Sequence, residues 1–331
     1  MTDNGRDSVG SPGATGRAVR LESFGGPEVL RIHELPVPRP DTGQIRVRVN
    51  AAGLNPMDWI MTADAQTAAR FGLSLPAGFG TDYAGVVDEV GDGVTGFAVG
   101  DRVYGGAVSR AVADFVVIDA AGTIAGGGVA HRTPGALDDR TAATLTIGAS
   151  TALAALAVVK PGPSDTVLIG GAAGGVGVFA VQLARRAGAR VIGTGAPTSA
   201  DFLRSLGAEP VAYGDGLADR VRALAPGGVT AAIDLYGDEV VYAARELGIP
   251  DQRITTIAAQ VDGVMPANGA NAAPSSLEEV AGLVAAGEVR VPIAATFPIE
   301  QIRSAVELQA GRHVHGKVVI DLQGPPPLRT K

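Results

Sequence analysis

The chain of 331 residues contains no cysteine, and aromatic residues make up only 4% of it. Disulfides, thiol nucleophiles and the sulfur ligands of most structural zinc sites are therefore excluded. No apolar run is long enough to cross a bilayer and no secretory leader is recognised, so we expect a cytoplasmic protein without a membrane segment. The net charge of −7 argues against a general nucleic-acid-binding protein, because that function needs a basic face.

Apolar residues make up 46% of the chain, and its length suits two packed domains. Residues 1–16 and 324–331 are expected to be flexible ends. Between residues 17 and 133, short alternating strands are punctuated by glycine and proline, which indicates a β-rich domain. The strands are expected at residues 18–22, 30–34, 44–50, 84–90, 102–104 and 113–117.

Helices and strands alternate from residue 134 to residue 287, which predicts a parallel sheet wound with right-handed crossovers. The helices are expected at residues 138–146, 150–159, 176–187, 199–206, 216–225 and 239–247, and the strands at 166–169, 190–193, 210–212, 231–235 and 253–257. Segment 262–274 resembles a loop. A strand at 289–298, a helix at 300–310 and a strand at 317–322 then restore the β-rich pattern. We therefore predict that the α/β domain is inserted into a β-rich domain of residues 17–133 and 288–323.

The most informative segment runs from Val167 to Gly177, where an apolar strand turns on glycines directly into an amphipathic helix. Small residues let the backbone approach a pyrophosphate, and the free N–H groups and dipole at the helix start favour its charge. The next apolar strand supplies a context that a chance cluster of glycines lacks, and a purely structural tight turn is the alternative. The dinucleotide site is predicted to contain Ala173, Gly174, Gly175, Val176 and Gly177.

Five blocks of sequence together resemble the zinc-free quinone oxidoreductase branch of the medium-chain dehydrogenase/reductase superfamily. In chain order they are Ala52-Gly53-Leu54-Asn55-Pro56-Met57-Asp58-Trp59, Gly80-Thr81-Asp82-Tyr83-Ala84-Gly85, Gly100-Asp101-Arg102-Val103, the glycine-rich segment, and Gly316-Lys317-Val318-Val319. The resemblance implies a Rossmann fold, a doubly wound parallel sheet, inserted into a GroES-like catalytic domain. Zinc-dependent relatives carry a cysteine near position 53 and Gly-His-Glu near position 80. Neither is present here, so no catalytic zinc is expected.

The second strand of the expected Rossmann domain ends without the carboxylate that NAD-selective folds place there for the ribose hydroxyls. Hydroxyls of Thr194, Thr198 and Ser199 could instead donate to a 2′-phosphate, and Tyr213 resembles a family tyrosine beside that group. We therefore expect NADPH rather than NADH. NADPH-using relatives have a lysine at the position of Ser199, for which Arg204 is the nearest substitute. Alternatively, Ser199 only caps the next helix.

The resemblance also places Asn55 beside the nicotinamide ribose and Thr151 at the cofactor, where the two domains meet. Gly193 and Ile257 complete the expected cofactor site. Asn55 could instead be a turn residue and Thr151 a helix cap. Asp234 either lies among ligands at the carboxyl edge of the sheet or begins a turn.

Hydride transfer needs orientation of two reactants and stabilisation of a developing oxyanion, and it needs no nucleophile. Reduction of a quinone or an α,β-unsaturated carbonyl leaves a phenolate or enolate that takes up a proton. The candidate catalytic residues are Asn55, Tyr83 and Asp58, the last two as proton donors beside water. Alternatively, Tyr83 lies in the core and Asp58 caps a helix.

Trp59 and the four histidines have no assigned chemistry. Trp59 either lines the substrate cleft or fills the core. The histidines lack metal-ligand spacing, and His313 and His315 are expected to be exposed on one side of a strand.

The sequence thus predicts a zinc-independent, NADPH-dependent reductase of quinones or α,β-unsaturated carbonyls. An enoyl-thioester reductase of the same fold is the nearest alternative, and a nucleotide-binding or sensing protein with weak turnover is another. The resemblance also implies a homodimer, in which a strand at residues 253–258, near the edge of the sheet, could pair across a two-fold axis.

Overall fold

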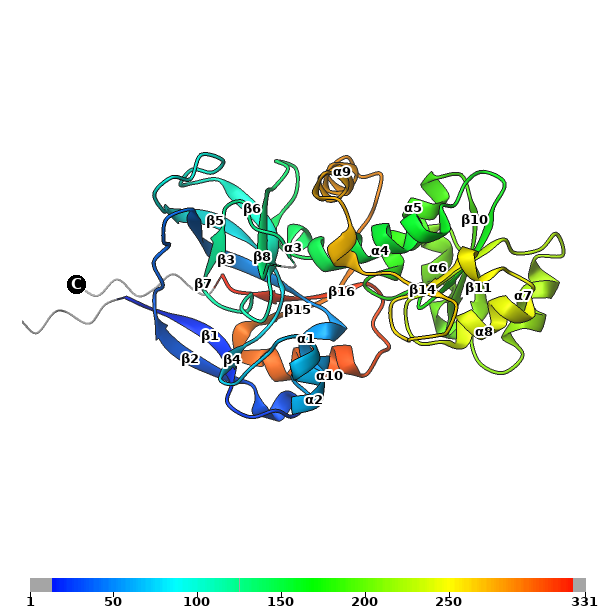
Figure 1. Cartoon of the computed structure of the whole chain (residues 1–331), viewed down its shortest axis with the longest axis horizontal. Coiled ribbons are helices and arrows are strands. Elements are labelled where there is room, and N and C mark those ends of the chain that lie inside the picture. The colour runs from blue at the N-terminus through cyan, green and yellow to red at the C-terminus, as the bar shows by residue number, and fades with distance from the viewer. Residues whose placement is uncertain (1–13, 125, 324–331) are drawn as a thin grey trace, which may run out of the picture.

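The computed structural model of the chain describes residues 14–124 and 126–323, which form two lobes side by side (Figure 1). Most of the leader expected at 1–16, and the whole tail expected at 324–331, lie outside the described residues. Thr15 and Gly16 already belong to the first strand. A search of the described residues finds no helix of the length and apolarity that a membrane span requires.

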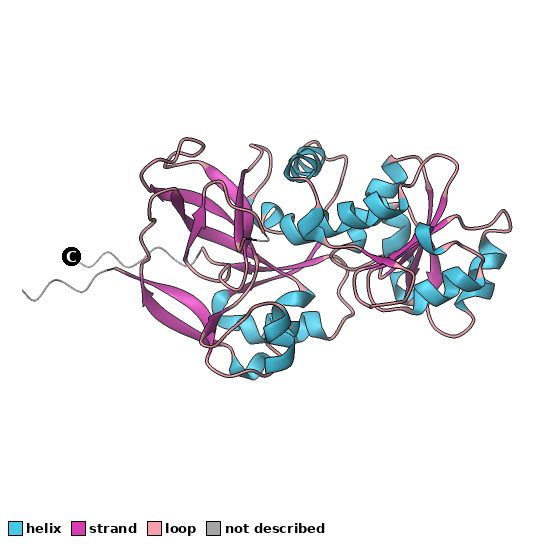
Figure 2. Ribbon diagram, in the orientation of Figure 1, coloured by secondary structure: helices cyan, strands magenta, loops and turns pink. Residues whose placement is uncertain are grey.

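The β-rich lobe holds a three-stranded and a seven-stranded sheet within the described ranges (Figure 2). Its first strands are β1 (Thr15–Leu21), β2 (Arg31–Pro36), β3 (Gln44–Leu54), β4 (Ala77–Gly78), β5 (Asp82–Val90), β6 (Arg102–Ala107), β7 (Phe115–Asp119) and β8 (Gly128–Arg132). The larger sheet has the order β15-β16-β3-β5-β6-β8, with β7 also paired to β3. Alternate residues Ile45, Val47 and Val49 of β3 are buried in the lobe's core, as expected for a strand with one covered face.

The last part of the chain returns to this lobe as β15 (Ile293–Pro298), α10 (Ile302–Ala310) and β16 (Lys317–Asp321). Strand β16 pairs antiparallel with β3, with Val318 opposite Leu54 and Ile320 opposite Ala52. Residues 264 to 270 positions apart in sequence are therefore paired in one sheet. This pairing confirms that the α/β part is inserted into the β-rich part.

The α/β lobe is built on a six-stranded parallel sheet in the part of the chain that is described. Its strands are β9 (Thr166–Gly170), β10 (Arg190–Gly195), β11 (Glu209–Ala212), β12 (Ala231–Asp234), β13 (Ile254–Thr256) and β14 (Met265–Pro266). The order β11-β10-β9-β12-β13-β14 is the 3-2-1-4-5-6 order of the doubly wound Rossmann fold. In such sheets ligands bind beyond the carboxyl ends of the strands, where the order reverses between β9 and β12.

Helices cover both faces of this sheet. They are α5 (Gly177–Arg186), α6 (Ala200–Leu206), α7 (Leu217–Leu224), α8 (Glu239–Glu246) and α9 (Pro274–Ala285), with α3 (Asp139–Ala142) and α4 (Thr146–Val159) leading into the lobe. Val167 and Ile169 face the core that contains α4 and α5, whereas Leu168 faces the core that contains α7 and α8. Alternating strand residues thus point into two separate cores.

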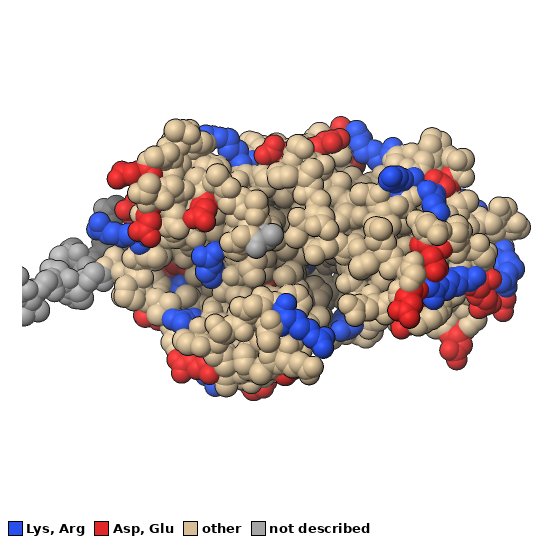
Figure 3. Space-filling view, viewed as in Figure 1, with Lys and Arg blue, Asp and Glu red and all other residues tan. Residues whose placement is uncertain are grey.

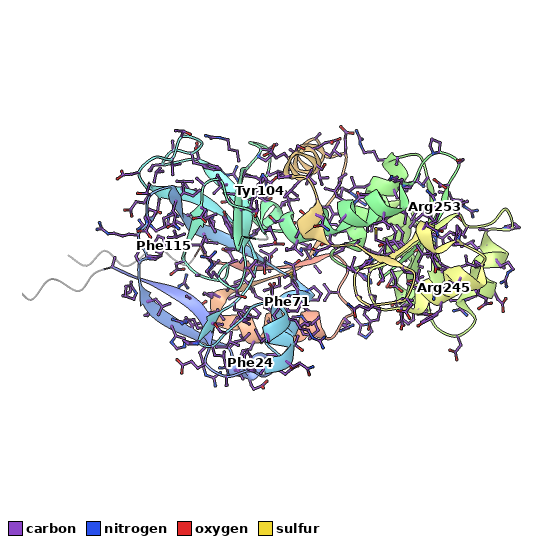
Figure 4. The ribbon with its side chains drawn as sticks, in the orientation of Figure 1. Phe24, Phe71, Tyr104, Phe115, Arg245 and Arg253 are labelled. Atoms are coloured by element: carbon purple, nitrogen blue, oxygen red, sulfur yellow. The ribbon has the colours of Figure 1, made fainter. Side chains whose placement is uncertain are left out.

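Two arginines labelled in Figure 4, Arg245 and Arg253, connect separate segments of the α/β lobe. Arg253 donates to the carbonyl of Val159 at the end of α4 and pairs with Asp165 at 2.5 Å. Arg245 pairs with Asp251 at 2.9 Å. The boundaries expected at 133/134 and 287/288 both fall in loops, before α3 and before β15, and we keep them as a proposed division.

Several expected elements need correction. The helix expected at 138–146 is only the short α3, and the helix expected at 150 begins at Thr146. Helix α9 and strand β8 were not anticipated, nor were α1 (Pro56–Ile60) and α2 (Ala65–Arg70). The short 3-10 helices are η1 (Pro27–Val29), η2 (Pro197–Ser199), η3 (Asp251–Arg253), η4 (Gly269–Asn271) and η5 (Ile299–Gln301).

Two corrections bear on the expected site and dimer. His313 and His315 lie in the loop before β16 rather than on a strand. The expected edge strand, β13, is flanked by β12 and by β14, so it is not outermost in its sheet.

Candidate functional site

The glycine-rich turn joins β9 to α5 in the manner of a nucleotide-binding loop. Gly171 has a φ of +63°, which allows the sharp turn after the strand. A Cβ on Gly177 would lie 2.5 Å from the backbone of Ala172, so only glycine fits where the helix starts. No hydrogen bond of the N–H groups of Gly175, Val176 or Gly177 is found within the described residues. These free donors at the start of a ten-residue helix are suited to an anion.

The end of β10 carries the residues expected at the adenosine ribose. Thr194 is buried and Thr198 is exposed, while Tyr213 lies at the end of the neighbouring strand and is 52% exposed. Ser199 occupies the N-cap position of α6, but its side chain makes no capping hydrogen bond; its Oγ lies 2.8 Å from Nε2 of His315. Ser199 therefore has the position of a helix cap, as the alternative expected, but its hydroxyl is not used for capping.

Gly193, expected in the same set, packs inside the lobe. A Cβ there would lie 2.9 Å from the Cβ of Ala172. Because position 193 carries no side chain, strand β10 can pack closely against Ala172 of the glycine-rich turn.

A buried polar cluster lies at the junction of the two lobes. The Nζ of Lys317 donates to Oδ1 of Asn55 at 2.7 Å, and Nδ2 of Asn55 donates to Oδ2 of Asp82 at 3.0 Å. The ammonium of Lys317 also lies 3.8 Å from Oδ2 of Asp82. All three side chains are almost completely buried, so each depends on the others to satisfy its polar atoms.

Asp58 extends this cluster at the start of α1. Its carboxylate accepts the N–H of Asn55 at 2.8 Å and the hydroxyl of Thr81 at 2.7 Å. Burial raises the pKa of Asp58 to about 7 and the pKa of Asp82 to about 6. Burial also lowers the pKa of Lys317, against the attraction of the carboxylates. The cluster therefore contains carboxyl groups that change protonation near neutral pH.

Lys317 connects the cluster to the glycine-rich turn. A Cβ on Gly175 would lie 3.0 Å from Cδ of Lys317, and the N–H of Gly316 donates to the carbonyl of Ala173 at 2.9 Å. The start of β16 is thus packed directly against the turn. The structure brings Asn55 and the glycine-rich turn into contact with the same lysine.

A cleft of about 610 Å³ opens beyond β13, lined by Arg70, Ile257, Ala258, Ala259, Gln260 and Pro266. Arg70 comes from α2 in the β-rich lobe, and the other lining residues come from the α/β lobe. The molecular surface is hollowed between the lobes in Figure 3. The expected cofactor residue Ile257 lies in this cleft, and its N–H donates to the carbonyl of Asp234.

Other expected residues have structural surroundings. Tyr83 is fully buried, its hydroxyl donates to the carbonyl of Val129 at 3.0 Å, and burial raises the pKa of its phenol. The proposed proton-donor role of Tyr83 is therefore withdrawn, because its hydroxyl is occupied inside the core. Thr151 lies in the middle of α4, so it does not cap that helix, and Gly269 packs closely against its hydroxyl.

Asp234 organises the turn after β12. Its carboxylate accepts the N–H groups of Tyr236, Gly237 and Val240 at 2.9 to 3.1 Å. The turn alternative for Asp234 is confirmed. Trp59 is half-buried, and its Nε1 donates to Gln309 at 3.1 Å.

Three residues of the site were not assigned from the sequence: Asp82, Lys317 and His315. The first two stand in motif blocks that carry the family resemblance, but a motif does not show that its lysine turns inward. His315 lies 116 residues from Ser199, and no local pattern links them. The described residues contain no group of three or more His, Asp or Glu side chains arranged to hold a metal ion.

Two family profiles match the chain: "Alcohol dehydrogenase GroES-like domain" at residues 41–142 and "Zinc-binding dehydrogenase" at residues 206–320. The chain is 38% identical over 183 residues to a quinone oxidoreductase of Homo sapiens; the match covers 54% of this chain and spans about half (52%) of that relative's length. It is 31% identical over 324 residues to the phthioceranic/hydroxyphthioceranic acid synthase of Mycobacterium tuberculosis, a match that covers 89% of this chain and 14% of the synthase.

Among solved structures, the quinone oxidoreductase from Coxiella burnetii superposes with a TM-score of 0.83. The two sequences are 28% identical, and the match covers 94% of this chain and all of the other. With the inserted doubly wound sheet and the glycine-rich turn, these similarities confirm the resemblance seen in the sequence. The chain belongs to the medium-chain dehydrogenase/reductase superfamily and is similar to its quinone oxidoreductases.

Proposed function

We propose that the protein is an NADPH-dependent, zinc-independent reductase that transfers a hydride directly to a quinone or an α,β-unsaturated carbonyl. The observation that carries this proposal is the glycine-rich turn, where three backbone N–H groups lack a partner within the described residues. Helix α5 begins at this turn, so its dipole adds to their attraction for a pyrophosphate.

Preference for NADPH is supported by the end of β10. A carboxylate would accept hydrogen bonds from both ribose hydroxyls and would repel a 2′-phosphate. No acid follows β10 until Asp201, which lies inside α6, is 98% exposed at its side chain and pairs with Arg204 at 2.7 Å. Near this edge, the hydroxyl of Thr198 is exposed and that of Ser199 is buried beside His315.

The bound nicotinamide would supply the hydride, and the protein's own residues would orient it. Asn55 is held by Lys317 and Asp82, so its amide has a fixed position at the lobe junction. Such fixation lowers the reorganisation that a correctly placed group needs during the reaction. Asp58 titrates near neutral pH but lies fully buried, so we assign it to the support of Asn55 and assign the final protonation to water.

Zinc independence is proposed from the residues at the positions where zinc-dependent relatives carry ligands. Gly53 and Thr81 offer no metal ligand of the required kind, and the chain has no cysteine. Activity should therefore survive dialysis against EDTA and should not increase when zinc is added.

The direct test is NADPH oxidation by the purified protein with a panel of quinones and enones, each repeated with NADH. We expect turnover that prefers NADPH. Tight NADPH binding without turnover of any acceptor would instead support a binding or sensing protein, and failure to bind either nucleotide would refute the proposal.

A second candidate is an enoyl-thioester reductase of the same fold. It is favoured by one observation, the match of 89% of this chain to a protein named as an acid synthase. Enoyl thioesters of different chain length belong in the same assay, and a kcat/KM for them above that for every quinone would favour this candidate. We also propose a homodimer, to be tested by light scattering at micromolar concentration, where a monomer would contradict it.

A further inference from the structure

The adenosine edge of the candidate site contains a histidine from the other end of the sequence. His315 lies in the loop before β16, and its Nε2 is 2.8 Å from Oγ of Ser199 at the start of α6. Its ring stacks on Phe202 of α6, with centroids 4.7 Å apart and planes 16° apart. The ring is therefore held by a hydrogen bond and by a stacked face.

The backbone beside His315 is also fixed. The N–H of Gly316 donates to the carbonyl of Ala173 in the glycine-rich turn at 2.9 Å. The loop thus runs from the expected pyrophosphate position to the end of β10. In the doubly wound fold, the residue at the end of the second strand decides between a ribose hydroxyl and a 2′-phosphate.

We propose that His315 supplies the positive charge that binds the adenosine 2′-phosphate, together with the hydroxyl of Ser199. The inference rests on the proposed use of NADPH and names the residue that selects it. Arg204, the nearest cation in the sequence, already pairs with Asp201 on the exposed side of α6. His315 contacts Ser199 directly, and an imidazolium donates charge-assisted hydrogen bonds to phosphate oxygens.

Because Ser199 and His315 are in contact, a substitution at His315 tests the 2′-phosphate site more clearly than one at Ser199. A carboxylate at position 199 would face His315 at hydrogen-bond distance, so Ser199→Asp would create a new ion pair as well as repel phosphate. Substitution of His315 removes the imidazole and its stack on Phe202 but adds no carboxylate beside the phosphate. His315→Gln keeps a polar group able to bond to Ser199, and His315→Arg keeps the charge.

His313 offers a matched control, because it is the same residue type in the same loop and is exposed. Adenosine 2′,5′-bisphosphate and adenosine 5′-monophosphate serve as probes, since they differ only in the 2′-phosphate. Their dissociation constants are measured by calorimetry for the wild type, His315→Gln, His315→Arg and His313→Gln.

We expect the wild type to prefer the bisphosphate, and His315→Gln to lose roughly tenfold or more of that preference, the size of a charge-assisted hydrogen bond. Affinity for the monophosphate should stay unchanged. His315→Arg and His313→Gln should keep the preference.

Two results would overturn the inference while leaving NADPH use intact. One is that His315→Gln keeps the wild-type preference for the bisphosphate. The other is that His315→Gln loses affinity for both probes equally, which would show that His315 only packs between the lobes. A wild type without any preference for the bisphosphate would instead refute NADPH selectivity and this inference together.

Discussion

The buried polar cluster of Asn55, Asp58, Asp82 and Lys317 and the glycine-rich turn both contact Lys317, yet the polar groups of the two are satisfied in opposite ways. In the cluster, Asn55, Asp82 and Lys317 satisfy one another's polar atoms without solvent. In the turn, the N–H groups of three consecutive residues have no partner within the described residues, and residues 173–176 are only half-buried.

This difference indicates that the buried cluster and the glycine-rich turn have separate roles, one in positioning residues and the other in binding a ligand. A cluster whose members are buried and mutually bonded is rigid but costs desolvation, and removal of one member leaves the others uncompensated. A turn with free N–H donors costs little folding free energy, because water molecules accept their hydrogen bonds until a ligand replaces the water. We infer that the cluster sets the geometry of the lobe junction, whereas the turn supplies affinity for an anion.

Removal of the cluster's cation should have the largest effect. Lys317→Met leaves the buried carboxyl of Asp82 without its ammonium partner, so we expect a loss of about 3–5 kcal/mol in the free energy of unfolding. Urea denaturation at pH 7 measures it. Lys160→Met, at an exposed lysine after α4, is the matched control and should change stability little. Equal free energies of unfolding for the two variants would show that Lys317 does not stabilise the buried carboxyl of Asp82.

The pH dependence of stability should reveal Asp58. In the folded protein this carboxyl keeps its proton up to about pH 7, whereas it loses it near pH 4 when unfolded. The folded state therefore binds more protons between these values, and its stability falls as pH rises through them. Asp58→Asn should remove the part of this fall that comes from Asp58, about 4 kcal/mol between pH 4 and 8, and leave the smaller part from Asp82.

The substitution suits the site, because the hydroxyl of Thr81 can accept a hydrogen bond from the new amide as well as donate one. Asp64→Asn is the control, since Asp64 is exposed and its hydrogen bond to the N–H of Thr67 lowers its pKa. Parallel stability curves for the wild type and Asp58→Asn would contradict the titration of Asp58.

The turn is tested by Gly177→Ala. The added Cβ would lie 2.5 Å from the backbone of Ala172, so the turn must deform, and we expect NADPH affinity to fall roughly hundredfold. Gly282→Ala is the control, because this helical glycine of α9 has open space around it and alanine favours a helix. Unchanged affinity in Gly177→Ala would show that the pyrophosphate does not bind there.

The smallest expected effect concerns Trp59. Trp59→Phe removes the hydrogen bond from Nε1 to Gln309 but keeps an aromatic ring beside Arg312. We expect a loss of about 1 kcal/mol in stability, with KM for quinones nearly unchanged. A large rise in KM would show that Trp59 contacts the substrate, and would contradict a role limited to packing in the β-rich lobe.

Local patterns predicted the α/β lobe well, because the apolar strand, glycine turn and amphipathic helix are close in sequence. Helix α9 was missed although Pro274 and the buried residues Leu277, Val280, Ala281 and Val284 carry a helical pattern. The Gly and Pro residues of the preceding segment concealed its start. Helix α1 was missed because five residues are too few for a periodic signal.

The candidate site was predictable only in part. Asn55 and Asp58 were identified, but their partners Asp82 and Lys317 come from distant strands whose pairing the local sequence does not encode. A lysine at the start of a strand is ordinarily exposed, and only the packing of β16 against the turn buries it. Ser199 and His315 meet for the same reason.

The central claim is that the glycine-rich turn binds the pyrophosphate of a nicotinamide nucleotide at the lobe junction. Calorimetric titration of the wild-type protein with NADPH and then with NADH tests it most directly. We predict one site per chain, with NADPH bound at least about tenfold more tightly than NADH. Binding of neither nucleotide would contradict the claim, and equal binding of both would contradict the choice of NADPH.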